Sequence, residues 1–328
     1  MKRIFENLKY LKLGTSTSDY PIYSQLIFSK DGNLYTCNGT EMVCIYDSDL
    51  DLGDGAINFH VLENYLKMYE GEIDNCELKD DKLIIRKGNL KTDLNVSHIN
   101  LPKIEVGDVD TVSITEEVLT ILKNSLNFVG SGILEHVYLD DKCICATDGA
   151  RVMFTEHSDY FGQPVGISKK ILSVLNVGDK IGVKDHNVVI YFKSGFAIFT
   201  ADKMESYPIK KIKDFVSTSF SNTLELCNLS NLREAFLIVE PVLFRETKRL
   251  VAMSHKNKLL SIKASSINGE AETKIETVFD KEFQLTFDIT MIRGVDTDYD
   301  VLISDVADKL LLTNNLKTNI ILMAYTNR

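Results

Sequence analysis

The residues that could carry chemistry are few and widely spaced. Asp47, Asp49 and Asp51 alternate along an acidic run, as carboxylates do at the start of a calcium-binding loop. Such a loop requires a glycine where Leu52 stands and a glutamate where Asn58 stands. We therefore expect a solvated acidic loop at this place rather than a calcium site.

The cysteines offer a second possible metal site. Cys143 and Cys145 are separated by one residue in an alternating strand pattern, so both thiols are expected on the same side of a strand. A Cys-x-Cys pair could supply half of a zinc site, but no second Cys or His pair has the matching spacing. We expect buried, reduced thiols and no disulfide framework in a chain of this size.

Signatures of catalysis are missing from the sequence. It contains no nucleophile–base motif, phosphate loop or dinucleotide fingerprint, and the six histidines are scattered. Gly130-Ser131-Gly132 is typical of a short turn rather than of a nucleotide-binding loop. The sequence therefore predicts a non-catalytic protein that needs no cofactor.

Charge and hydropathy restrict the location and the partners. The formal net charge is −10, which argues against general affinity for nucleic acid but does not exclude a local basic face. No apolar run approaches the length of a membrane span, and the first residues do not resemble a secretory signal. We expect a cytoplasmic protein that does not bind membranes.

The elements that must position these residues occur three times along the chain. An Asn/Asp-Gly pair closes an apolar strand at Asn38-Gly39, Asp148-Gly149 and Asn268-Gly269. A short amphipathic helix is predicted about twenty residues after each pair, beginning near His60, Ser168 and Asp288. Because the period is about 110 residues, too long for a solenoid unit, the repeat indicates three whole domains of one design.

Each predicted domain reads as a helix, a group of strands, a second helix and a second group of strands. The first helices are expected after Thr115 and Ser230, which are predicted to cap them, and in a shorter form around Leu8. Pro102 and Pro208 end the last strands of the first two domains and are predicted to open connectors. We predict an α+β protein with antiparallel sheets and domains at 1–107, 108–215 and 216–328.

The polar faces of the second helices have two possible uses. Near Ser168, the apolar residues Ile171 and Leu172 point away from Lys169 and Lys170. In the helix near His60 the apolar stripe and the opposite polar face are predicted as Val61, Leu62, Tyr65 and Tyr69 against Glu63, Asn64 and Lys67. These faces are either ordinary solvated surfaces or a weakly basic lining that touches phosphates without sequence preference.

Three motifs give the chain a resemblance to the bacterial-type sliding clamp, the beta subunit of the replicative DNA polymerase. The segment 146–152, Ala-Thr-Asp-Gly-Ala-Arg-Val, is similar to the Ala-Thr-Asp-Gly-His-Arg-Leu of the family's middle domain. Phe199-Thr200 followed by Tyr207-Pro208 resembles the end of that domain, and 268–272 resembles the third domain's Gly-Glu-Ala-Glu segment. The resemblance covers nearly the whole chain.

The resemblance implies a head-to-tail homodimer that forms a ring of six domains, with twelve helices lining a central hole. Such a ring holds double-stranded DNA by topology, without sequence preference, which makes a net negative charge tolerable. By family position, the residues facing the DNA would be Lys169, Lys170, Lys123, Lys67, Arg233, Arg293, Lys2, Arg3 and Lys9. Lys169 and Lys170 carry the most weight, because their helical phase also points them away from the core.

The resemblance also implies a pocket that receives a short peptide of the DNA polymerase or of the clamp loader. Carried over by motif, its walls would be Thr147, Gly149, Arg151 and Val152 on one side and Leu322, Met323 and Tyr325 on the other. Ala150 replaces the family's usual histidine, and the last residues depart from the usual Met-Pro-Met-Arg-Leu ending. Such a re-cut pocket would suit a phage-encoded or specialised clamp.

Ring closure would join strands from two copies. The resemblance places Leu94 and Val96 of the first domain against the strand around Lys274 and Ile275 of the third. A lysine at 274 either weakens closure, because an unpaired ion is costly to desolvate, or points outward and pairs with an acid. The implied function is a processivity factor that tethers a DNA polymerase. The alternative is an adaptor that keeps the fold, forms no ring and binds a protein partner.

Overall fold

The computed structural model describes residues 2–16, 21–46, 53–70, 72–98, 106–157, 163–185, 187–201, 204–278, 280–296, 298–304 and 308–324. The acidic run at 47–52 lies outside these residues. The chain forms two compact units. The first unit contains residues 1–116, 160–165 and 170–203, and the second contains 117–159, 166–169 and 204–328.

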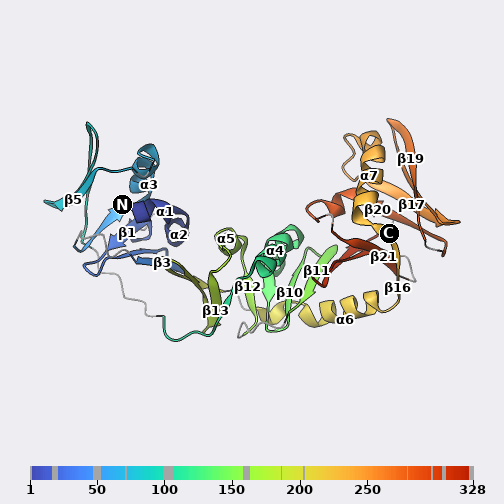
Figure 1. The fold of residues 1–328 in the computed structure, drawn as a ribbon, viewed down its shortest axis with the longest axis horizontal. Helices are drawn as coiled ribbons and strands as arrows, with labels where there is room; N and C mark the ends of the chain where they lie inside the picture. Colours follow the sequence, from blue (N-terminus) through green and yellow to red (C-terminus); the bar gives the residue numbers. More distant parts are fainter. Residues whose placement is uncertain are drawn as a thin grey trace. The chain divides into compact units, whose positions relative to one another are not determined.

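The first unit is built on an eight-stranded sheet with the order β4-β1-β2-β3-β15-β14-β13-β8 and a separate three-stranded sheet β5-β6-β7 (Figure 1). Its helices are α1 (Lys2–Glu6), α2 (Leu8–Leu11), α3 (Phe59–Met68) and the 3-10 turns η1 (Lys12–Gly14) and η2 (Pro21–Ser24). The strands are β1 (Gln25–Phe28), β2 (Asn33–Cys37), β3 (Glu41–Tyr46), β4 (Gly55–Asn58), β5 (Asn75–Lys79), β6 (Lys82–Lys87), β7 (Leu90–Asn95), β8 (Thr111–Ser113), β13 (Lys180–Lys184), β14 (Asn187–Phe192) and β15 (Gly195–Thr200).

The second unit repeats this plan. An eight-stranded sheet has the order β12-β9-β10-β11-β23-β22-β21-β16, and a four-stranded sheet has the order β19-β18-β17-β20. The helices are α4 (Glu116–Ser125), α6 (Ile209–Phe220), α7 (Leu229–Val239) and the 3-10 turns η3 (Leu126–Phe128), η4 (Gly132–Glu135), η5 (Met204–Ser206), η6 (Glu240–Leu243) and η7 (Ile289–Ile292), while α5 (Lys169–Leu172) falls at the division between the units. The strands are β9 (Val137–Leu139), β10 (Cys143–Thr147), β11 (Arg151–Glu156), β12 (Val165–Ile167), β16 (Thr223–Asn228), β17 (Leu250–Lys256), β18 (Leu259–Ser266), β19 (Gly269–Glu276), β20 (Phe283–Asp288), β21 (Asp300–Ser304), β22 (Lys309–Thr313) and β23 (Thr318–Met323).

The three Asn/Asp-Gly pairs form the predicted turns. They join β2 to β3, β10 to β11 and β18 to β19. Gly39, Gly149 and Gly269 have φ angles of +97°, +89° and +130°. Residues other than glycine rarely adopt such angles. The glycine of each pair is therefore required by the backbone, and the predicted repeat is confirmed at these three hairpins.

The second helices differ from their predicted form. α3 is a full helix, but α5 has four residues and η7 is a single 3-10 turn. Gly178 and Gly294, with φ angles of +89° and +77°, occur in the turns that follow α5 and η7. Neither glycine ends its helix, because Gly178 lies six residues beyond Leu172 and the backbone is already extended at Arg293. Of the three segments, only α3 extends beyond about one turn.

Two predicted helix details are wrong. α7 is capped by Asn228, whose side chain accepts a hydrogen bond from the backbone N–H of Asn231, and not by Ser230. In α3 the buried face contains Glu63, whereas Val61 is 42% exposed. Glu63 is buried because its carboxylate is paired with two lysines, a contact that apolar periodicity does not reveal.

A helix follows Pro208 where a connector was predicted. α6 has twelve residues and runs along one face of the second eight-stranded sheet (Figure 1). Ile212 and Val216 are buried in a core cluster with Val152, Phe154 and other residues of that face. The spacing of Ile209, Ile212, Val216 and Phe220 was the available signal, since these residues follow one side of a helix.

The two eight-stranded sheets have the same construction. In the first, β3, which follows Asn38-Gly39, pairs with β15; in the second, β11, which follows Asp148-Gly149, pairs with β23. The predicted α+β class is confirmed. The division into three domains at residues 107 and 215 stays a prediction, because the two compact units do not correspond to the predicted domains one by one. No helix in the described ranges has both the length and the apolar composition needed to span a membrane.

Candidate partner pocket and charged surfaces

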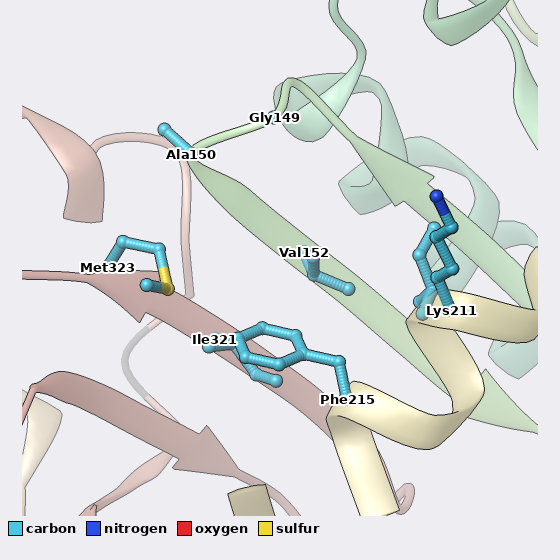
Figure 2. A pocket seen from close by; sticks show the side chains of 8 residues that line it. Gly149, Ala150, Val152, Lys211, Phe215, Ile321 and Met323 are labelled. Carbon is cyan, nitrogen blue, oxygen red and sulfur yellow. The ribbon is translucent and has the colours of Figure 1, made fainter. Parts of the chain in front are cut away.

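An apolar pocket of about 310 Å³ opens between β11, β23 and α6. Val152 and Ile321 are directly paired across the two strands, and α6 crosses the same face of the sheet. Figure 2 shows Phe215 beside Ile321, with Met323 and Lys211 on opposite sides of the cavity. The lining residues are Gly149, Ala150, Val152, Lys211, Ile212, Phe215, Ile321 and Met323.

The predicted pocket residues divide into those that line the cavity and those that support it. Gly149, Val152 and Met323 line it, and Tyr325 lies outside the described residues. Leu322 stands between Ile321 and Met323 in the strand, and both of these residues line the pocket. Because side chains alternate along a strand, Leu322 points to the other face of the sheet, where it is fully buried.

Thr147 supports the turn at the pocket rim. Its hydroxyl donates to the carbonyl of Arg151 at 2.7 Å and accepts from the backbone N–H of Gly149 at 3.1 Å. The carboxylate of Asp148 accepts from the N–H groups of Ala150 and Arg151, at 3.0 and 2.7 Å. These bonds hold the Asp148-Gly149 turn closed.

Arg151 is used inside the protein. Its Nε pairs with Asp148 Oδ2 at 2.7 Å, and its two terminal nitrogens donate to the carbonyls of Asn127 at 2.6 Å and Met291 at 3.3 Å. The guanidinium also lies over the Phe128 ring, 5.1 Å from its centroid. Arg151 therefore joins three segments behind the pocket and does not line the cavity.

The side of α6 away from the pocket is fixed by Asp140. Its Oδ1 accepts from the backbone N–H groups of Lys142 and Cys143, and its Oδ2 accepts from Tyr138 at 3.0 Å and pairs with Lys213 of α6 at 3.3 Å. Burial alone would raise the pKa of Asp140, but the two N–H donors, Lys213 and the phenol outweigh it and hold the pKa below its ordinary value. The carboxylate thus anchors α6 to the sheet.

The thiols of Cys143 and Cys145 belong to the core beneath α6, on the same side of β10 as predicted. All six cysteines are free, and burial raises the pKa of Cys145 to about 12. A protonated thiol is a poor nucleophile and metal ligand. The described residues contain no group of three His, Cys, Asp or Glu side chains arranged to hold a metal ion.

In the first unit, the predicted DNA-facing lysines are largely engaged with neighbours. Lys67 pairs with Glu63 at 2.6 Å, and Lys9 donates to Asn176 at 3.1 Å. Lys170 pairs with Glu41 and donates to the carbonyl of Leu13 at 3.0 Å, although it points away from the core as predicted. Lys2 and Arg3 belong to α1, and the structure describes their backbone but not their side chains.

In the second unit, the two predicted arginines are also engaged. Arg233 donates to the carbonyls of Ile292 and Val295, and Arg293 pairs with Glu240 at 3.1 Å. Lys123 and Lys169 are exposed and make no hydrogen bond or ion pair with any described residue. The structure therefore leaves few of the predicted cations with an unshared charge.

The predicted ring-closing residues lie on or beside strands at sheet edges. β7 carries Leu94 and pairs only with β6 among the described strands, and Val96 follows it, buried. β19 carries Lys274 and Ile275 and pairs only with β18 in the described part of the chain. Lys274 is exposed and lies 3.6 Å from Glu272 of the same strand, so within one copy the lysine has an acidic neighbour.

No family model matches the sequence, and no curated protein sequence matches it. Solved structures do resemble the fold. The DNA polymerase III subunit beta from Pseudomonas aeruginosa matches with a TM-score of 0.79 at 14% identity, over 98% of each chain. The Helicobacter pylori beta clamp bound to a DNA ligase peptide matches with a TM-score of 0.76 at 14% identity, over 99% of this chain and 98% of that one.

A further structure, a DNA polymerase sliding clamp from Pseudomonas aeruginosa with ligand, matches with a TM-score of 0.80 at 15% identity, over 99% of this chain and 97% of that chain. The chain thus has the fold of bacterial sliding clamps over nearly its whole length. The resemblance first read from short motifs is confirmed as a resemblance of fold.

Proposed function

We propose that this chain is a DNA sliding clamp, a non-catalytic subunit that encircles duplex DNA and tethers a DNA polymerase. Two copies would join head to tail into a ring. The proposal is supported by the clamp fold over nearly the whole chain and by a regularity in the sheets. That regularity predicts where two copies meet.

The regularity is the observation that carries the proposal. In each eight-stranded sheet, the strand after an Asn/Asp-Gly turn pairs with the last strand of the next repeat: β3 with β15, and β11 with β23. Among the described strands, the third strand of this kind, β19, has one side unpaired, and so has β7, the last strand of the first repeat. Pairing β19 with β7 of another copy would complete the series, because an unpaired edge is a template for a further strand.

Exposed apolar residues beside β19 support the same contact. Phe244 and Ile267 are 64% and 97% exposed. They are close together, because the side chain of Asn268 donates to the carbonyl of Phe244 at 3.1 Å, just before β19 begins. Leu90, at the start of β7, is 55% exposed. Large apolar side chains gathered at a sheet edge are typical of a protein–protein interface.

The proposed grip on DNA is topological. Most of the predicted cations already share their charge with acids or carbonyl groups, which leaves Lys123 and Lys169 as the best candidates for phosphate contacts. Few phosphate contacts mean weak, salt-sensitive affinity. A closed ring needs no more than that, because it is retained by its shape.

The pocket beside α6 is the proposed site for a peptide of the polymerase and of the clamp loader. The cavity is lined mainly by Val152, Phe215, Ile321 and Met323, as suits apolar anchor residues. The Helicobacter pylori clamp of the same fold is described as bound to a DNA ligase peptide. We expect this chain to bind its partners' segments in a comparable way.

Retention on circular DNA tests the proposal. The protein is diluted with nicked circular plasmid to open the ring, concentrated to close it, and separated from free protein by gel filtration at high salt. Protein that co-elutes with the circle and is released when a restriction enzyme linearises the plasmid supports a ring. Protein that never co-elutes, or that stays on linear DNA, contradicts it and favours the adaptor function.

A further inference from the structure

The pocket beside α6 has one charged group. Of its lining residues only Lys211 is ionisable, and the others are glycine, alanine, aliphatic, methionine or phenylalanine residues. Lys211 is exposed and makes no hydrogen bond or ion pair with any described residue. A lone cation at the side of an apolar cavity is free to pair with a ligand.

Neighbouring charges do not compete for that role. Arg151 and Asp148 neutralise each other at 2.7 Å behind the rim. On the opposite side of α6, Lys213 is held by Asp140 at 3.3 Å. Asp214 does not line this cavity. The charge inside the pocket is therefore positive, and an acidic group entering it would meet no resident carboxylate among its lining residues.

The positions of Lys211 and Phe215 link charge to apolar contact. They are four residues apart in α6, so they lie on the same flank of the helix. Figure 2 shows Phe215 over Ile321 and Lys211 on the side of the cavity opposite Met323. If a partner segment packed an apolar side chain against Phe215, its next residue would lie close to the ammonium group of Lys211.

We propose that Lys211 selects partner segments that carry an acidic side chain directly beside the apolar anchor. This inference rests on the proposed peptide-binding role of the pocket. The attraction is strengthened by the apolar lining, which lowers the local dielectric. A free chain terminus offers the same carboxylate chemistry, so the test includes both sources.

The test measures the binding of labelled synthetic peptides by fluorescence anisotropy. Each peptide carries two adjacent leucines in a Gly/Ser frame with an amidated end. One set has aspartate next to the leucines on either side, a second has asparagine there, and a third has lysine. A fourth places a free carboxyl terminus directly after the leucines. The proteins are wild type, K211M, K211E, F215A and the matched control K210M, which alters an exposed lysine that does not line the pocket.

We expect wild type to bind one aspartate peptide about fivefold more tightly than its asparagine counterpart, and this preference to fade at high salt. K211M should remove the preference without weakening the asparagine peptide, K211E should favour the lysine peptide, and K210M should behave as wild type. A preference that survives in K211M, or that is confined to the peptide with the free terminus, overturns the inference.

The outcomes separate this inference from the proposed function. One possible result is that the asparagine peptide binds wild type more tightly than F215A, while the aspartate peptide binds wild type no more tightly than the asparagine peptide does. In that case the pocket binds peptides, but Lys211 does not select them. If no peptide of any charge binds, both the pocket and the role of Lys211 are contradicted. Circular dichroism of each variant checks that α6 is still formed.

Discussion

At the scale of single residues, the guanidinium of Arg151 joins several segments of the chain close to the pocket. It donates to the carbonyls of Asn127 and Met291, pairs with Asp148, and lies against Phe128. Asn127 in turn donates to the carbonyl of Gly294 at 2.8 Å. The arginine thus connects η3, the rim turn and η7.

Removing this group should destabilise the second unit. We expect R151M to lower the free energy of unfolding by about 2–3 kcal/mol, because two carbonyls and one carboxylate lose a charged donor. Urea denaturation followed by far-ultraviolet circular dichroism measures the change. R293M removes an arginine whose side chain is 60% exposed and is expected to cost less than 1 kcal/mol. Equal losses in the two variants would contradict the role of Arg151.

At the scale of elements, α6 is the segment that builds one side of the pocket. Tyr207, just before the helix, stacks on Tyr138 with ring centroids 5.0 Å apart, and Lys213 reaches Asp140. Loss of the Lys213–Asp140 contact should therefore weaken the packing of α6 on the sheet.

The anchor predicts a pH dependence. The pKa of Asp140 is lowered in the folded protein, so its contribution to stability is complete above the unfolded value of about 3.9 and is lost as the pH falls through the folded value. We expect D140N to be less stable than wild type at pH 7, and the difference to shrink below about pH 4. Urea denaturation at several pH values tests this. A constant difference would show that the charge of Asp140 does not stabilise the helix.

The edge strand β19 and its apolar neighbours give a second prediction for an element. F244D places a charge on a 64% exposed side chain, so the fold should survive, but the proposed contact between copies should not. We expect the dissociation constant of the dimer to rise by at least about tenfold. V177D, at a side chain that is 58% exposed in the first unit, is the matched control. Dimers of unchanged strength in F244D would place the interface elsewhere.

The elements best predicted from sequence are those with a strong local cause. Asn38-Gly39 and its two counterparts demand left-handed glycines, and α4 has a clear apolar period. α6 was missed because Pro208 was read as the start of a connector, although its spacing of apolar residues is helical. Proline ends a strand but equally allows a helix to begin after it.

The charged site residues were less predictable, for a physical reason. Helical phase shows which way Lys170 points, and this was right, but it does not show that Glu41 of a distant strand will neutralise it. The carbonyl groups that bind Arg233 belong to the last residue of η7 and to Val295, about sixty residues away in sequence. Such partners depend on tertiary packing, which periodicity does not contain.

At the scale of the whole molecule, the proposed ring holds DNA with few charges. K123E combined with K169E should reduce recovery on circular plasmid by about tenfold at low salt, because two unshared cations become anions facing phosphate. K317E, in the exposed turn before β23, is the control and should load as wild type does. Recovery is measured by gel filtration of the plasmid complex. Unchanged recovery in the double variant would remove these lysines from the DNA surface.

The central claim is that two copies of this chain close one ring through β7 and β19. Sedimentation equilibrium at micromolar concentration tests it most directly. The claim predicts a mass of twice 37.0 kDa, which falls toward 37.0 kDa in F244D while V177D keeps the doubled mass. A wild-type protein that sediments as a monomer of 37.0 kDa even at tens of micromolar would contradict the ring.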